Sequence, residues 1–108
     1  MQEMTRPKIV CLTGSTKFID EYDNQMLRLT LEGCIVLTVG SHKPRARQYA
    51  DNLDNHKVKL DELHFRKIEL ADELFVINIG GYIGYSTKRE IDHATKLNKS
   101  ITYLEPQE

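Results

Sequence analysis

The chain has 108 residues, of which 40% are hydrophobic and 29% charged, and 15 basic against 16 acidic residues leave a formal net charge of -1. This length holds one hydrophobic core, so we expect a single domain over residues 1–108. The balanced charge argues against polymeric nucleic acid or a membrane surface as a partner. No apolar run has the length of a signal peptide or a spanning helix, so we expect a cytoplasmic protein.

The first part of the chain has the pattern of strand, helix and strand. Residues 8–12 (KIVCL) are a β-branched run that predicts a strand, and the turn TGSTK follows at once. Ser15 or Thr16 can cap the next helix, which Gly33 ends. Residues 34–39 (CIVLTV) are apolar without alternation, as expected of a strand covered on both faces.

The second part repeats this alternation. Residues 53–71 have helical periodicity, residues 74–79 are an apolar strand run, and residues 87–98 form an amphipathic helix pattern before a short strand at 100–104. Strands that alternate with helices predict a parallel sheet with helices on both faces. We therefore expect an α/β fold, a three-layer Rossmann-like (flavodoxin-like) sheet of about four strands in the order 2-1-3-4. In this order a ligand crevice opens at the C-terminal ends of the first and third strands.

The turn after the first strand contains candidate ligand-binding residues. Backbone N–H groups from Gly14 onward, the hydroxyl of Ser15 and the ammonium of Lys17 suit an anion such as a phosphate. The alternative is a glycine turn in which Ser15 or Thr16 only caps a helix, although a cap does not need Lys17. His42 lies in the basic loop after the second strand and is a second candidate phosphate contact.

Glu90 has two interpretations. Thr87 and Glu90 have the spacing of a capping box, in which the glutamate bonds back to the N-cap amide. Alternatively, the helix start keeps Glu90 ionised and directs it into the crevice, where it attacks an electrophilic carbon.

His64 also has two interpretations, because it lies on the apolar stripe of its predicted helix. It is either a core histidine whose ring N–H finds a carbonyl, or an acid or base that gives a proton to a leaving group beside Glu90.

The glycine loop after the third strand, GGYIGYS, lacks the GxGxxG spacing of a dinucleotide fingerprint. Its glycines, Gly81 among them, let a ligand approach the backbone, and Tyr82 can stack on a base or simply cover the end of the sheet. The histidines and cysteines have neither CxxC nor HExxH spacing, so we expect no metal and no cofactor. Cys11 and Cys34, in or beside apolar runs, are expected to be buried and reduced.

These motifs together resemble the nucleoside 2-deoxyribosyltransferase-like superfamily, which includes nucleotide N-glycosidases. The resemblance covers most of the chain, roughly residues 8–104. It rests on TGSTKF after the first strand, VLTVGSH at the second, and ADELFVINIGGYIGYSTKREIDHA.

The resemblance implies that Glu90 is the nucleophile that attacks C1' of a nucleoside or nucleoside 5'-monophosphate and displaces its base. It also implies that Gly14 and Ser15 lie near the sugar or 5'-phosphate and that Ser86 belongs to a phosphate loop. The candidate substrate-binding residues are Gly14, Ser15, Lys17, His42, Gly81, Tyr82, Ser86 and Thr87. The catalytic candidates are Glu90 and His64.

Two departures from the family pattern matter. His64 stands where the family commonly has an aspartate that assists proton transfer, and residues 84–88 (GYSTK) replace the usual serine-x-glycine-x-glycine loop. Substrate identity therefore does not transfer. We expect N-glycosidic hydrolysis or base exchange on a small nucleoside or nucleotide, by a homo-oligomer. The alternatives are a non-catalytic nucleotide-binding module of the same fold and a small structural protein in which Glu90 is only a cap.

Overall fold

The strands form one parallel sheet in the predicted order, β2-β1-β3-β4. The structure, a computed structural model, describes residues 6–38 and 57–107. The four strands are β1 (Ile9–Gly14), β2 (Ile35–Leu37), β3 (Glu73–Ile77) and β4 (Ser100–Tyr103). Three α-helices accompany them in the described ranges: α1 (Ile19–Leu31), α4 (Lys57–Leu70) and α5 (Tyr85–Lys96).

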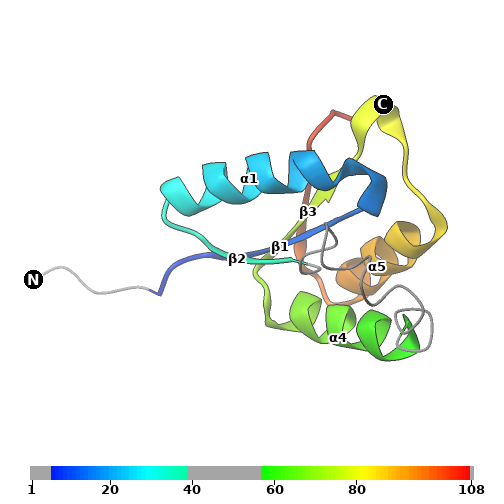
Figure 1. Cartoon of the computed structure of the whole chain (residues 1–108). Helices are drawn as coiled ribbons and strands as arrows, with labels where there is room; N and C mark the ends of the chain where they lie inside the picture. Colours follow the sequence, from blue (N-terminus) through cyan, green and yellow to red (C-terminus); the bar gives the residue numbers. More distant parts are fainter. Residues whose placement is uncertain (1–5, 39–56, 108) are drawn as a thin grey trace, which may run out of the picture.

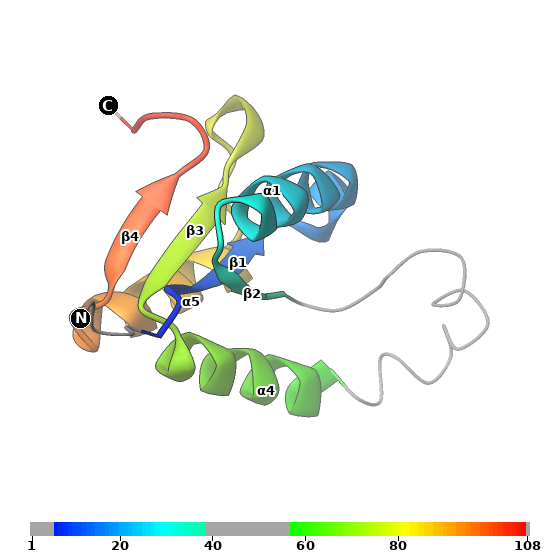
Figure 2. The same ribbon diagram turned by 90° about the vertical axis from the view of Figure 1, so that its left-hand side faces the viewer.

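The sheet lies between two helical layers, so the α/β prediction is confirmed (Figures 1 and 2). Helix α1 covers one face, and α4 and α5 cover the other. Alternation along β1 explains this division, because successive side chains of a strand point to opposite faces. Val10 and Leu12 pack with Tyr22 of α1, whereas Cys11 packs with Ile68 of α4.

The two central strands end at the same level. Val10 pairs with Glu73 and Gly14 with Ile77, so β1 lies beside β3 over the full length of β3. Two short 3-10 turns follow these ends: η1 (Thr16–Phe18) after β1 and η3 (Ile79–Gly81) after β3. The loops that carry most of the candidate residues therefore begin at the C-terminal ends of the two central strands.

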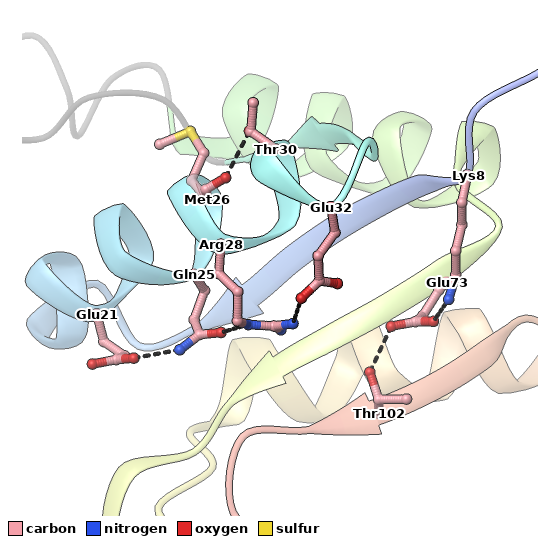
Figure 3. A network of polar contacts seen from close by, with 9 residues as sticks. All are labelled: Lys8, Glu21, Gln25, Met26, Arg28, Thr30, Glu32, Glu73 and Thr102. Atoms are coloured by element: carbon pink, nitrogen blue, oxygen red, sulfur yellow. Dashed lines mark hydrogen bonds and ion pairs between the residues drawn. The ribbon is translucent and has the colours of Figure 1, made fainter.

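Polar contacts tie the strands together at their opposite, N-terminal ends (Figure 3). The buried carboxylate of Glu73 lies 2.5 Å from the Lys8 ammonium and accepts a 2.7 Å hydrogen bond from the Thr102 hydroxyl. These contacts link β3 to β4 and to the segment that leads into β1.

The predicted helix at 87–98 begins earlier in the structure, at Tyr85, and ends at Lys96. The helix expected directly after a cap at Ser15 or Thr16 is preceded by the 3-10 turn η1, so α1 begins only at Ile19. Within the described ranges, no helix combines the length and the apolar character that a membrane crossing requires.

Candidate active site

The carboxylate of Glu90 lies against β1 at the C-terminal end of the sheet. It accepts a hydrogen bond from the hydroxyl of Thr13 through its Oε1 atom. The Nε2 atom of His64 lies 3.5 Å from the same oxygen. The structure thus brings the two predicted catalytic residues together and adds Thr13, a third residue.

Three elements place these side chains on one face of the sheet. Thr13 follows Cys11 by two residues, so both point toward the layer of α4 and α5. His64 precedes the buried Ile68 by one helical turn of α4, and Glu90 precedes the buried Ala94 by one turn of α5. The apolar positions that anchor each helix therefore also direct its functional side chain toward the end of β1.

The three side chains differ in their access to solvent. Thr13 is completely buried, and the side chains of His64 and Glu90 are 6% and 14% exposed. The carboxylate is thus the most accessible group of the three, which a nucleophile requires.

Burial is the main cause that lowers the pKa of His64 to about 4, and the positive charge of Lys67 lowers it further. The Leu12 carbonyl and the Asp61 carboxylate oppose this effect only partly. At neutral pH the imidazole is therefore uncharged. A neutral ring does not supply the leaving-group proton expected of His64, although it can accept a proton or donate its single N–H.

The nearby thiol and phenol are not reactive groups at neutral pH. Burial, with Glu90 as the second cause, raises the pKa of Cys11 to about 12. The same two causes raise the pKa of Tyr22 above its usual range, and its hydroxyl donates a 2.6 Å hydrogen bond to the Gly14 carbonyl. Cys11 is buried as predicted, whereas Cys34 is only partly buried.

The capping-box interpretation of Glu90 is wrong. The N-cap of α5 is Gly84, which has no side-chain capping hydrogen bond, and Thr87 is a buried residue inside the first turn. Glu90 follows in the second turn, where its carboxylate contacts Thr13 and His64 instead of the start of its own helix.

The turn after β1 has a structural explanation for two of its three candidate residues. Gly14 adopts a φ of 145°, and a Cβ atom there would lie 2.6 Å from the Ile77 carbonyl oxygen. Ser15 caps η1 by accepting a 3.3 Å hydrogen bond from the Lys17 amide. The Lys17 ammonium lies 3.7 Å from the ring centroid of Tyr82, so two predicted substrate-binding side chains are in contact.

The remaining candidate substrate-binding residues lie around the start of α5, except for one that lies outside the residues that the structure describes. Gly81 adopts a φ of 79°, and the side chains of Tyr82 and Ser86 are exposed. Thr87, by contrast, is only 4% exposed. His42 lies outside the described residues.

Within residues 6–38 and 57–107, no three His, Cys, Asp or Glu side chains gather in a way that could hold a metal ion. No protein-family model matches this chain, and no curated protein matches it either. What the geometry establishes is a four-stranded parallel α/β fold with a carboxylate, a hydroxyl and a neutral imidazole in contact at the C-terminal end of β1.

Proposed function

We propose that this chain breaks the N-glycosidic bond of a nucleoside or nucleoside 5'-monophosphate, with Glu90 as the nucleophile. The observation that carries the proposal is the carboxylate of Glu90, held by Thr13 beside His64 at the end of β1. The resemblance of the chain to the nucleoside 2-deoxyribosyltransferase-like superfamily supports it, because that resemblance independently selects the same glutamate.

The reaction has two steps that follow the logic of retaining glycoside hydrolysis. In the first step, a carboxylate oxygen of Glu90 bonds to C1' of the sugar while the bond from C1' to the base nitrogen breaks, and the electron pair leaves with the base. In the second step, the oxygen of a water molecule bonds to C1' and the ester bond to Glu90 breaks. The proton that the water loses is the proton that the departed base gains, so the sum is one nucleoside and one water giving one sugar and one base. If a second base replaces the water, the same chemistry exchanges bases.

The test is a search for released base. The protein is incubated with the common ribonucleosides, deoxyribonucleosides and their 5'-monophosphates, and the products are separated by chromatography. We expect at least one of these compounds to lose its base, and Glu90→Ala to lower that rate on the order of 10³-fold or more.

Asp92→Ala is the matched control, because Asp92 is an exposed acid on the same helix that contacts only Lys96 in the described ion pairs. It should keep full activity. The proposal fails if the panel yields no free base or if Glu90→Ala is as active as the wild type.

The neutral state of His64 favours one alternative, a module that binds a nucleotide without changing it. A site that lacks a protonated acid at neutral pH can bind its ligand and leave it intact. A nucleotide that raises the melting temperature and is recovered unchanged would favour this alternative.

A further inference from the structure

We propose that Thr13 and His64 are positioning residues for Glu90: both donate hydrogen bonds to Oε1 and thereby fix the plane of the carboxylate for attack. This inference rests on the proposed function, because positioning matters only if Glu90 reacts. Thr13 was not among the residues that the sequence pattern selected.

Thr13 is a rigid donor. Its side chain is completely buried, and its backbone is held in the sheet opposite Val76 of β3. A β-branched side chain in a strand has few χ1 choices, so the hydroxyl cannot follow a moving carboxylate. The hydroxyl donates to Oε1 of Glu90 and thus joins the central strand directly to α5.

The tautomer of His64 determines which ring nitrogen can donate a hydrogen bond to Glu90. Among the residues that the structure describes, the buried Nδ1 atom has no hydrogen-bond partner of good geometry. A proton on Nδ1 would leave a buried donor unsatisfied, which proteins avoid. We place the proton on Nε2, the atom that faces Oε1 of Glu90 at 3.5 Å and the Cys11 sulfur at 4.0 Å. The Leu12 carbonyl is a second acceptor for the ring N–H.

In this tautomer, the nitrogen that faces the Glu90 carboxylate carries the proton and has no free lone pair, so it cannot accept a proton. Because the ring is neutral, it is not a strong acid either. The contact of 3.5 Å is long, as catalytic contacts often are before the substrate arrives. Thr13 and His64 both contact Oε1 of Glu90. The proton that the water releases passes to the departed base, and His64 does not carry it.

Conservative variants separate positioning from proton transfer. Thr13→Val keeps the shape and removes the hydroxyl, whereas Thr13→Ser keeps the hydroxyl. His64→Gln puts an amide N–H donor near the place of Nε2–H but cannot exchange a proton, whereas His64→Ala removes both capacities.

With the nucleoside or nucleotide that the panel identifies as cleaved fastest, we expect Thr13→Val to lower kcat roughly 10- to 100-fold with little change in KM. Thr13→Ser should restore most of this loss, and His64→Gln should keep most of the activity that His64→Ala loses. If His64→Gln is as inactive as His64→Ala, His64 exchanges a proton and its positioning role is overturned.

A control variant tests whether the effect on kcat is specific to the site, and urea unfolding tests the contact between Thr13 and Glu90 without any measurement of activity. Thr102→Val removes another threonine hydroxyl that donates to a glutamate, Glu73, at the other end of the sheet, and should leave kcat unchanged. Urea unfolding of Thr13→Val, Glu90→Gln and the double variant tests the contact itself. We expect the two single shifts in the unfolding midpoint not to add in the double variant.

The outcomes distinguish the two proposals. If Glu90→Ala stays active while the Thr13 and Glu90 shifts are non-additive, the contact exists and the proposed function fails. If Glu90→Ala is inactive while Thr13→Val is fully active and the shifts add, the proposed function stands and the positioning role of Thr13 is overturned.

Discussion

The buried imidazole of His64 makes the stability of the protein depend on pH in a window set by two pKa values. The ordinary pKa of 6.5 applies to the unfolded chain, and burial lowers it to about 4 in the folded chain. Between these values the unfolded state binds a proton that the folded state does not. The free energy of unfolding therefore falls as the pH drops from about 6.5 to about 4, by roughly 1 to 3 kcal/mol, and this group adds no further loss at lower pH.

The measurement is urea unfolding at a pH of about 7 and of about 4.5, with His64→Gln as the control. Glutamine has no proton to bind, so the variant should lose less stability over this interval. The ion pair with Arg6 and a hydrogen bond from the Ile9 amide lower the pKa of Asp72 to about 2, so its stabilisation is lost in a more acidic range, from about 3.8 downward. An equal loss in the wild type and in His64→Gln would contradict the prediction.

The sequence placed Glu90 and His64 near one another but missed Thr13. Glu90 stands out because it lies near the start of a predicted helix, where the helix dipole favours a carboxylate. His64 stands out because a polar side chain is unusual on a helix face that also holds buried apolar residues. A threonine in a strand is ordinary, since its β-branched side chain suits the sheet. The available indication was its position, two residues after Cys11 and at the strand end where a ligand crevice is expected.

At the scale of the elements, the start of α5 shows where local patterns mislead. Thr87 and Glu90 have capping-box spacing, but the chain enters the helix at Gly84, before Thr87 is reached. Burial of Thr87 and the contact of Glu90 with Thr13 outweigh the local capping choice. Tertiary contacts of this kind involve residues far apart in the chain and leave no local pattern.

The close approach of β1 and β3 predicts a large cost for Gly14→Ala. The new Cβ atom would lie 2.6 Å from the Ile77 carbonyl oxygen, at a φ that side chains rarely adopt. We expect the free energy of unfolding to fall by roughly 3 kcal/mol or more, from backbone strain and overpacking together. Chemical denaturation measures this loss.

Gly33→Ala is the matched control, because Gly33 also has a positive φ, 91°, but a Cβ atom there meets nothing within 4 Å. Only backbone strain applies, so we expect a loss of roughly 1 to 2 kcal/mol. Equal losses in the two variants would mean that the contact with Ile77 is unimportant.

At the scale of the whole molecule, the fold could be predicted because the patterns that determine it, apolar strand runs alternating with helical segments, occur along the whole chain. The apolar run at residues 74–79 predicted a strand, and every residue of β3 is buried. The run at 34–39 was expected to be covered on both faces, but this was wrong, because β2 is the edge strand of the sheet and its Ile35 is exposed. The alternation of strands and helices then left few topologies. The expected homo-oligomer depends on a surface that meets another copy, so it stays a prediction.

The contacts at the N-terminal ends of the strands, shown in Figure 3, should contribute to global stability. Glu73→Gln removes the charge that faces Lys8 while keeping an oxygen that accepts from Thr102. Because Glu73 is buried but Lys8 is half exposed, we expect a loss of roughly 1 to 2 kcal/mol in the free energy of unfolding.

Glu32→Gln provides the comparison, since Glu32 pairs with Arg28 and both side chains are about half exposed (Figure 3). It should change the free energy of unfolding by no more than about 0.5 kcal/mol. Thermal or urea unfolding of both variants gives the two values. A larger effect for Glu32→Gln would contradict this ranking.

The pairing of β1 with β3 also predicts an order of events in folding. Ile9 donates its amide hydrogen to Asp72, 63 positions later, and Thr13 reaches Glu90, 77 positions later. Loops of this length close slowly, and the loss of chain entropy comes before the contacts that offset it. Local helices such as α1 can form early, but the Glu90 carboxylate acquires its partners only when β1 and β3 join. A nascent or partly unfolded chain therefore has no assembled site, and recovery of the proposed activity during refolding should coincide with the slowest phase of sheet formation.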